Sequence, residues 1–223
     1  MKNIVIVGSS RGIGKELVQL LANDNNVLAL SRNLAPLKDF KKNSNVIIEK
    51  FDVSNDALTP LLQKHFKSVD IIVNNAGLLI NKPLLELSDK DIELSYQTNV
   101  FGLIKACQSV VPFMLKKGGH IINIGSMGGF QGSVKFPGLS VYSSSKAAVA
   151  SFTECLAEEL RDTNIKANCL ALGAAQTEML NEAFPDYKAP VSAYEMAKFI
   201  ADFSLNAHQW INGKVIPVSL STP

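Results

Sequence analysis

The 223-residue sequence contains little cysteine, little net charge and no long apolar run. Its three cysteines, Cys107, Cys155 and Cys169, lie far apart and lack the paired spacing of a zinc site, and the three histidines are equally isolated. We therefore expect no metal site. An odd number of cysteines in an apolar setting is typical of reduced thiols, so we expect a cytoplasmic protein.

The net charge is only +2, and the lysines and arginines are scattered among acidic residues. A nucleic-acid-binding protein would carry a basic patch, so no nucleic-acid partner is expected. No apolar stretch approaches the roughly 20 residues needed to span a bilayer. The first residues lead directly into an apolar run that is too short for a signal peptide. We therefore expect no membrane partner, and chemistry on a small molecule is the better hypothesis.

Short β-branched runs alternate with longer segments of helical period, which is typical of βαβ units on a parallel sheet buried on both faces. We predict strands at residues 3–7, 26–31, 46–50, 69–73, 119–125, 165–171 and 214–217. We predict helices at residues 12–23, from Thr59 onward, and at 88–116, 140–161 and 192–205. No linker or repeat divides the chain, so residues 1–223 are expected to form a single domain of class α/β.

Two loops rich in glycine and proline, at residues 125–138 and 173–190, each follow a predicted strand. In open α/β sheets the ligand cleft lies beyond the carboxyl ends of the strands. We therefore expect these two loops to form walls of that cleft.

A glycine-rich turn with the spacing G-x-x-x-G-x-G, at Gly8, Gly12 and Gly14, directly follows the first predicted strand. Glycines there let backbone N–H groups and the positive end of a helix approach a pyrophosphate. The spacing differs from G-x-G-x-x-G and from the P-loop. Strand-to-helix turns also use glycine for structural reasons alone. The position after the first strand favours a dinucleotide site.

The second strand ends at Ser31-Arg32, where an NAD site would carry an acid for the ribose 2′-hydroxyl. Ser31 and Arg32 could instead bind a 2′-phosphate through charge-assisted hydrogen bonds, with Arg11 as a second cation. The alternative is that Arg32 is a solvated loop residue. We favour NADP(H) over NAD(H).

Tyr142 and Lys146 are four residues apart and so project from one face of a predicted helix. A phenol with a pKa of about 10 exchanges protons poorly at neutral pH unless a nearby cation favours the phenolate. Ser126 ends the fifth predicted strand and could hold a substrate oxygen by a hydrogen bond. The alternative is that Tyr142 and Lys146 are an ordinary pair on a helix surface.

The order of these motifs resembles that of short-chain dehydrogenases/reductases, over nearly the whole chain. The motifs are Gly8 to Gly14, Asp52-Val53, Asn74 to Gly77, Asn99, Ser126, Tyr142-x-x-x-Lys146 and Gly173-x-x-x-Thr177. The resemblance implies a Rossmann-like, doubly wound parallel sheet of about seven strands in three layers, α/β/α. It also implies a nicotinamide cofactor.

By the same resemblance, Tyr142 is the acid/base, and Lys146 lowers its pKa and binds the nicotinamide ribose. Ser126 would polarise the carbonyl, and Asn99 would support a proton-relay water. The expected cofactor-binding residues are Gly8, Ser10, Arg11, Gly12, Ile13, Gly14, Ser31, Arg32, Asp52, Val53, Asn75, Ala76, Gly77, Tyr142, Lys146, Gly173 and Thr177.

Three segments depart from the family pattern. The loop between Ser126 and Tyr142 is longer than usual, and the segment 177–190 is shorter than the usual substrate lid, which predicts an open pocket. The last predicted strand continues with Ser219-Leu220-Ser221 in place of Asp-Gly-Gly. Because the first two segments choose the substrate, the sequence leaves the substrate undefined.

The leading hypothesis is an NADP(H)-dependent oxidoreductase that interconverts a small-molecule carbonyl and an alcohol by hydride transfer. The alternative is a catalytically silent NADP-binding sensor or scaffold on the same fold, since fold alone does not establish function. The segments 91–116 and 140–161 are apolar enough to pair across a two-fold axis, and the resemblance implies a homodimer or homotetramer.

Overall fold

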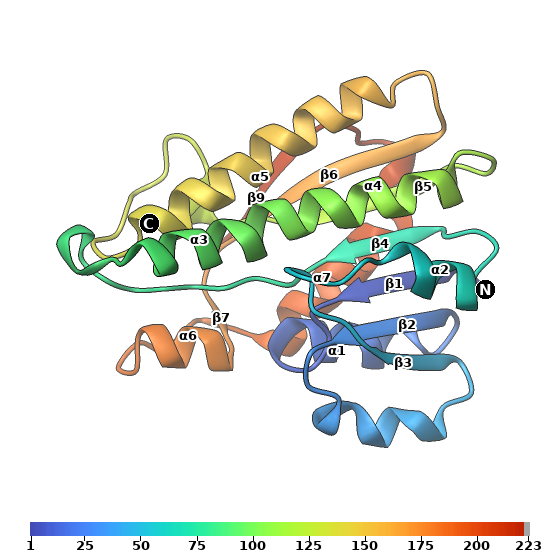
Figure 1. Ribbon diagram of the computed structural model, residues 1–223, viewed down its shortest axis with the longest axis horizontal. Helices are drawn as coiled ribbons and strands as arrows, with labels where there is room; N and C mark the ends of the chain where they lie inside the picture. The colour runs from blue at the N-terminus through green and yellow to red at the C-terminus, as the bar shows by residue number, and fades with distance from the viewer. Residues whose placement is uncertain (221–223) are drawn as a thin grey trace.

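The computed structural model describes residues 1–220 and contains the predicted parallel sheet. Seven parallel strands lie in the order β3-β2-β1-β4-β5-β6-β9 (Figure 1). They are β1 (Asn3–Val7), β2 (Asn26–Ser31), β3 (Val46–Lys50), β4 (Ile71–Asn74), β5 (Gly119–Ile124), β6 (Ile165–Leu172) and β9 (Val215–Val218). The strand order reverses between β1 and β4, which creates the switch point of a doubly wound sheet. The predicted Rossmann-like α/β fold is confirmed.

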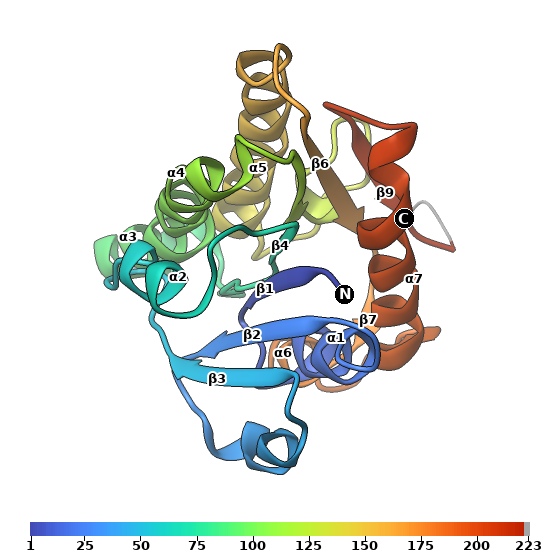
Figure 2. The ribbon, with the colours of Figure 1, turned by 90° about the vertical axis from the view of Figure 1, so that its right-hand side faces the viewer.

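Helices cover both faces of this sheet. They are α1 (Gly12–Leu21), α2 (Thr59–His65), α3 (Asp89–Tyr96), α4 (Gly102–Met114), α5 (Ser140–Glu159), α6 (Glu178–Ala183) and α7 (Ala193–Asn206). Figure 2 shows α4 and α5 on one side of the sheet and α1 and α7 on the other. The arrangement is the expected three-layer α/β/α sandwich.

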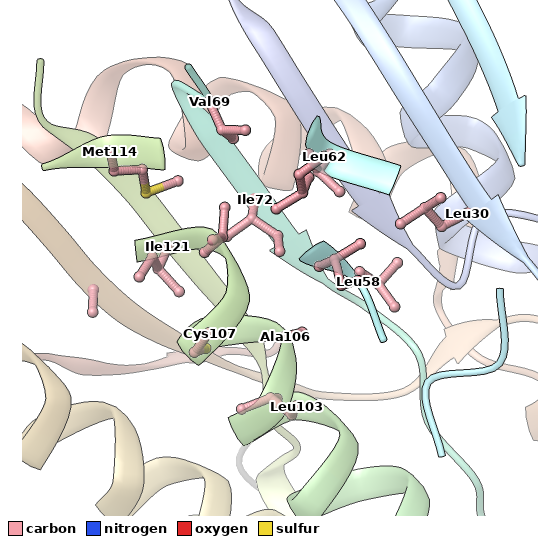
Figure 3. Packing of buried hydrophobic residues seen from close by; sticks show 14 of the residues in the cluster. Leu30, Leu58, Leu62, Val69, Ile72, Leu103, Ala106, Cys107, Met114 and Ile121 are labelled. Atoms are coloured by element: carbon pink, nitrogen blue, oxygen red, sulfur yellow. The ribbon is translucent and has the colours of Figure 1, made fainter. Parts of the chain in front are cut away.

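Each strand contributes to two hydrophobic cores because successive side chains point to opposite faces. In β1, Val5 belongs to the core beneath α4 and α5, whereas Ile4 and Ile6 belong to the core beneath α1 and α7. Figure 3 shows the first core, where Leu103 and Met114 of α4 lie among side chains of the sheet. Burial on both faces explains why the strands read as continuous apolar runs.

The predicted helix over residues 88–116 is divided into three parts. Ser88 is the N-cap of α3 and forms a capping box, accepting a hydrogen bond from the Asp91 backbone N–H. A π-helical segment, η3 (Gln97–Phe101), then precedes α4. The start of α4 packs so closely that a Cβ on Gly102 would lie 2.5 Å from the Val53 carbonyl oxygen. The π turn is a local insertion that hydrophobic periodicity does not reveal.

Several short elements were not predicted, because they are shorter than the window in which periodicity is visible. They are the 3-10 turns η1 (Ala35–Lys42), η2 (Leu84–Glu86), η4 (Met127–Gly129) and η5 (Ala207–Gln209), and the two-stranded pair β7 (Ala175–Gln176) and β8 (Val191–Ser192). Helix α6 also lies within a segment that we expected to be a loop. Helix α1 ends two residues earlier than predicted, where the Asn25 side-chain amide donates to the Leu21 carbonyl at 3.0 Å.

Within residues 1–220, no helix combines the length and the apolarity needed to cross a membrane. The predicted departure at Ser221 lies outside the described residues.

Candidate active site

A cavity of about 930 Å³ lies at the carboxyl ends of the strands. Its wall includes the turn after β1, the ends of β2 and β4, the loop after β5, and α6, which extends beyond the same end of the sheet (Figure 1). Lining residues that match the predicted site are Gly8, Ser10, Arg11, Gly12, Ile13, Ser31, Arg32, Asp52, Val53, Asn75, Ala76, Gly77, Ser126, Tyr142, Lys146, Gly173 and Thr177. Of the predicted residues, Gly14 and Asn99 lie behind this wall.

The glycine-rich turn has a backbone that only glycine fits. Gly8 has φ +87°, and a Cβ there would lie 2.6 Å from the Cα of Ala76. A Cβ on Gly14 would collide with the Gly8 carbonyl oxygen. The Asn75 side chain donates to that same oxygen at 2.7 Å, which locks the turn to the end of β4.

Helix α1 starts beside this turn without a side-chain cap from its N-cap residue, Arg11. The first N–H groups of a helix have no partner within the helix and carry partial positive charge. Together with the absence of a Cβ on the turn's glycines, this arrangement fits the pyrophosphate of a dinucleotide.

At the end of β2, Ser31 is buried and Arg32 is exposed, and both line the cavity. The Asp52 carboxylate accepts hydrogen bonds from the Ser54 backbone N–H at 3.0 Å and from the Asn55 side chain at 3.2 Å. Asp52 therefore stabilises the turn after β3, while Arg32 is the cation that this end of the cavity presents.

Arg11 forms an ion pair with Glu182 of α6, although the two residues are 171 positions apart in the sequence. Both side chains are largely exposed, so the pair contributes at most about 1 kcal/mol and can be displaced. Glu178 of the same helix lies near the turn, 3.4 Å from the position of a Cβ on Gly12. The short segment after Thr177 thus reaches across the phosphate turn, which the expectation of an open pocket did not anticipate.

Tyr142 and Lys146 both face the cavity from the first turns of α5. The Lys146 side chain is only 4% exposed, and its Nζ donates to the Ile124 carbonyl at 2.8 Å. Nζ lies 6.0 Å from the centroid of the Tyr142 ring. The two groups therefore share the cavity, and they do not form a surface pair.

Burial shifts the pKa values of both groups. Removal from water lowers the pKa of Lys146 to about 8. Burial raises the pKa of Tyr142, and a hydrogen bond with Ser126 opposes that rise. In the chain alone, Tyr142 is thus a weaker acid than a free phenol, opposite in direction to the lowering that the resemblance ascribed to Lys146. That lowering stays a prediction for the complex with cofactor.

Ser126 is held in the loop directly after β5. Its Oγ accepts a hydrogen bond from the Gly128 backbone N–H at 3.1 Å, which caps η4. Ser126 lines the cavity together with Tyr142, and its hydroxyl is close enough to the phenol to affect the pKa of Tyr142.

Asn99 is fully buried in the π-helical segment η3. Its side-chain amide donates to the Leu78 carbonyl and to the Ser145 Oγ, both at 2.9 Å, and accepts from the Leu78 N–H at 2.7 Å. Asn99 thus joins α5 to the segment after β4. Sequence reasoning missed Ser145, because no local signal marks a partner 46 residues away.

The cavity also has an apolar part that sequence reasoning located only as two loop ranges. Met127, Phe136 and Leu139 come from the loop before α5, and Met179 and Phe184 come from the segment after Thr177. Large apolar residues within predicted loops were the available signal, because a loop has no core of its own to bury them in.

Among residues 1–220, no group of three or more His, Cys, Asp or Glu side chains could hold a metal ion.

The Rossmann-like sheet, the glycine turn at its switch point and the Tyr142–Lys146 pair in the cavity wall are together the features of a nucleotide-binding oxidoreductase. The sequence profile described as short chain dehydrogenase matches residues 2–188. The chain therefore belongs to the short-chain dehydrogenase/reductase family.

Named relatives agree with this assignment. The 3-oxoacyl-(acyl-carrier-protein) reductase FabG of Chlamydia pneumoniae is 34% identical over 200 residues, which are 84% of this chain and 79% of the relative. A diacetyl reductase, (S)-acetoin forming, of Staphylococcus epidermidis is 34% identical over 80% of this chain and 73% of its own. The structure named ElxO with NADP bound has a TM-score of 0.85 at 28% identity, covering 98% of this chain and 97% of that one.

Proposed function

We propose that this protein is an NADP(H)-dependent oxidoreductase that interconverts a carbonyl and an alcohol, with Tyr142 as acid/base. One observation carries the proposal: Tyr142, Ser126 and Lys146 face the same cavity as the glycine turn. The Tyr142 phenol and the Ser126 hydroxyl can donate to the oxygen of a reacting carbonyl, while the glycine turn binds a dinucleotide.

A nicotinamide cofactor held by the glycine turn and Lys146 would supply the hydride for carbonyl reduction, or accept one in alcohol oxidation. Tyr142 donates its phenol proton to the carbonyl oxygen during reduction, and Ser126 donates a hydrogen bond to that oxygen. In the chain alone, burial raises the pKa of Tyr142, so the phenol is protonated at neutral pH. In the complex, the Lys146 charge would lower the pKa of Tyr142 and make the phenol a better proton donor. Below pH about 8, Lys146 carries a charge that attracts the phenolate left behind and can bind the nicotinamide ribose. Asn99 positions α5 through its hydrogen bond to Ser145, and we assign to Asn99 the support of a proton-relay water.

Ser31, Arg32 and Arg11 support a preference for NADP(H) over NAD(H), since a 2′-phosphate needs hydrogen-bond donors and positive charge. Both cofactors occur among similar structures: a serine dehydrogenase structure is named as complexed with NADP+, and a 4-hydroxyisoleucine dehydrogenase structure as complexed with NADH. The remaining predicted cofactor residues, from Gly8 to Thr177, would hold the pyrophosphate, adenine and nicotinamide parts.

The test is to incubate the protein with NADPH or NADH and a panel of aldehydes, ketones and quinones, and to follow the loss of absorbance. We expect turnover, with NADPH preferred. Tight NADPH binding without turnover across a broad panel would instead favour the silent sensor or scaffold.

We further propose that residues 1–223 act as one NADP-binding domain, in the cytoplasm, as a homodimer or homotetramer. A cytoplasmic location is supported by the free thiols of Cys107, Cys155 and Cys169. The exposed Phe101 and Ile92, on the outer face of η3 and α3, support self-association. Light scattering at micromolar concentration tests this, and a monomer alone would contradict it.

A further inference from the structure

The charged side chains in the cavity wall are few, and each lies where the cofactor is proposed to bind. Among the described lining residues, the cations are Arg11, Arg32 and Lys146, and the acids are Asp52 and Glu178. Arg32 and Asp52 follow β2 and β3, and Arg11 and Glu178 lie at the phosphate turn. Lys146 donates to a backbone carbonyl behind the catalytic phenol. Of these cations, Arg11 reaches the segment after Thr177, where its guanidinium is already paired with Glu182.

That apolar part is formed by two segments that meet at one mouth. The segment after β4 joins them: the Lys82 backbone N–H donates to the Gly138 carbonyl at 3.0 Å, and the Asn81 side chain donates to the Ala183 carbonyl at 2.9 Å. The loop before α5 and the segment after Thr177 therefore border the same opening. Apart from Ser126 beside the phenol, and Thr177 and Glu178 beside the turn, the side chains that they contribute to the wall are apolar or aromatic. They include Met127, Phe136, Leu139, Met179, Leu180, Phe184 and Tyr187.

Three lysines lie near this mouth, and none lines the cavity. Lys188 is exposed beside Tyr187, and the other two have partners. Lys82 forms an ion pair with Asp91 at 2.8 Å, and the Lys135 Nζ donates to the Phe130 carbonyl at 2.6 Å and to the Ser133 Oγ at 2.7 Å. A carboxylate or phosphate buried between these two segments would thus lie against an apolar wall that offers it no unpaired cation, which is costly.

The rim outside the cavity continues the apolar surface. Phe136 is 42% exposed although it lines the cavity, and Tyr187 is also exposed. Leu84 and Leu85 are exposed on the segment after β4 that joins the two loops. Exposed apolar side chains around a cavity mouth indicate a ligand whose apolar body extends to that mouth.

We propose that the substrate is a neutral carbonyl compound with a hydrocarbon body, aliphatic or aromatic, and without a carboxylate or phosphate group. The carbonyl end lies at Tyr142 and Ser126, and the body lies between the loop before α5 and the segment after Thr177. This inference rests on the proposed reductase function and narrows it to a substrate class.

Kinetics with NADPH test the class. We compare 2-decanone with 2-butanone, which is shorter, and with 9-oxodecanoate, which has the same length and an added charge. Each fully buried methylene is worth up to about fourfold in affinity, so we expect kcat/KM for 2-decanone to exceed both others by about tenfold or more. Equal or better turnover of 9-oxodecanoate, or no effect of chain length, would overturn the inference and leave the reductase function intact.

A binding measurement separates the two proposals, because it requires no turnover. Calorimetry on the protein with NADPH bound should show decanamide binding about tenfold more tightly than butanamide, because its longer chain is transferred from water to the apolar wall. Decanamide should also bind more tightly than decanoate. If no carbonyl compound is turned over but this ranking holds, the reductase proposal fails and the apolar site remains. Decanoate binding as tightly as decanamide would overturn the site itself.

Two arginine variants on one loop provide a matched control. Phe136→Arg places a cation in the cavity wall, so it should lower kcat/KM for 2-decanone and narrow the gap to 9-oxodecanoate by about tenfold. Val134→Arg adds the same charge at a residue that is 52% exposed and outside the wall, so it should change neither value by more than about twofold. Equal effects of the two variants would contradict the proposed position of the substrate.

Discussion

At the scale of single residues, the cavity contains a buried ammonium that weakens the fold. Lys146 is almost completely removed from water, and its Nζ donates a hydrogen bond to the Ile124 carbonyl. A pKa lowered to about 8 means that the folded chain disfavours the charged form of this side chain. A buried charge that lowers stability and lies at a cleft is typical of a functional site, where reactive groups are often unfavourable for folding.

Replacing this lysine should therefore stabilise the protein. A pKa lowered to about 8 corresponds to about 3 kcal/mol at neutral pH, and loss of one hydrogen bond returns about 1 kcal/mol. We expect Lys146→Met to raise the free energy of unfolding at pH 7 by about 2 kcal/mol, with loss of activity. Denaturant unfolding measures this difference.

The lowered pKa of Lys146 also determines how its effect on the free energy of unfolding changes with pH. The unfolded lysine titrates near pH 10.4 and the folded one at about pH 8, so the cost is complete below pH 8 and disappears as the pH rises toward 10. The stability gap between Lys146→Met and the wild type should shrink over that interval. A variant less stable than the wild type at pH 7 would contradict this account of Lys146.

Arg32 is the residue on which the cofactor preference depends. Arg32→Asp replaces a proposed phosphate partner with a repelling charge, so it should weaken NADPH binding by about tenfold or more and reduce the preference over NADH. Arg161→Asp is the control, because Arg161 is an exposed arginine paired with Glu158 on α5, outside the cavity wall. If the ratio of kcat/KM with NADPH to kcat/KM with NADH is unchanged in Arg32→Asp, Arg32 does not bind the 2′-phosphate.

The positions of Tyr142, Lys146 and Ser126 were predictable because helical spacing and strand ends are local properties of the sequence. The partners of Asn99 and Arg11 were not, since Ser145 and Glu182 become neighbours only through the tertiary fold. The direction of the Tyr142 pKa shift in the chain alone was also missed, because it depends on burial, which spacing does not report.

At the scale of elements, the turn between β1 and α1 is the most constrained segment of the cleft. Its glycines allow close packing against the end of β4 as well as the approach of a phosphate. The glycine spacing predicted this turn, and hydrophobic periodicity predicted the long helices. It did not predict η3, α6 or the β7–β8 pair, whose conformations depend on contacts with distant segments.

Two alanine variants separate close packing from backbone strain. Gly8 and Gly132 both have positive φ, but a Cβ on Gly132 would meet nothing within 4 Å. Gly132→Ala should cost about 1–2 kcal/mol of stability, from the left-handed backbone alone. Gly8→Ala should cost at least about 2 kcal/mol more, because Ala76 must move, and it should weaken NADPH binding. Equal losses in denaturant unfolding would show that packing at the turn is unimportant.

The ion pair between Arg11 and Glu182 links the phosphate turn to α6. Glu182→Gln frees Arg11 and removes a negative charge beside the proposed pyrophosphate site, so NADPH should bind up to about fivefold more tightly. Glu158→Gln is the matched control, since Glu158 pairs with Arg161 outside the cavity wall. Fluorescence titration measures both, and unchanged or weaker binding in Glu182→Gln would exclude competition between Glu182 and the cofactor.

At the scale of the whole molecule, the doubly wound sheet brings side chains that are far apart in sequence to one edge. The rhythm of strands and helices predicted the fold class and seven strands, because a parallel sheet buried on both faces requires continuous apolar runs. The shape of the apolar part of the cavity was not predictable in the same way. It depends on how the loop before α5 lies relative to the segment after Thr177, and the sequences of these two segments have no hydrophobic periodicity.

The account depends most on a proton-donating phenol at the bound dinucleotide, and Tyr142→Phe tests this most directly. The variant keeps the ring and removes the hydroxyl, so turnover with NADPH should fall by about 100-fold or more. NADPH affinity, measured on the same sample by fluorescence titration, should stay within about twofold of the wild type. A Tyr142→Phe protein that keeps near-wild-type turnover would contradict the account.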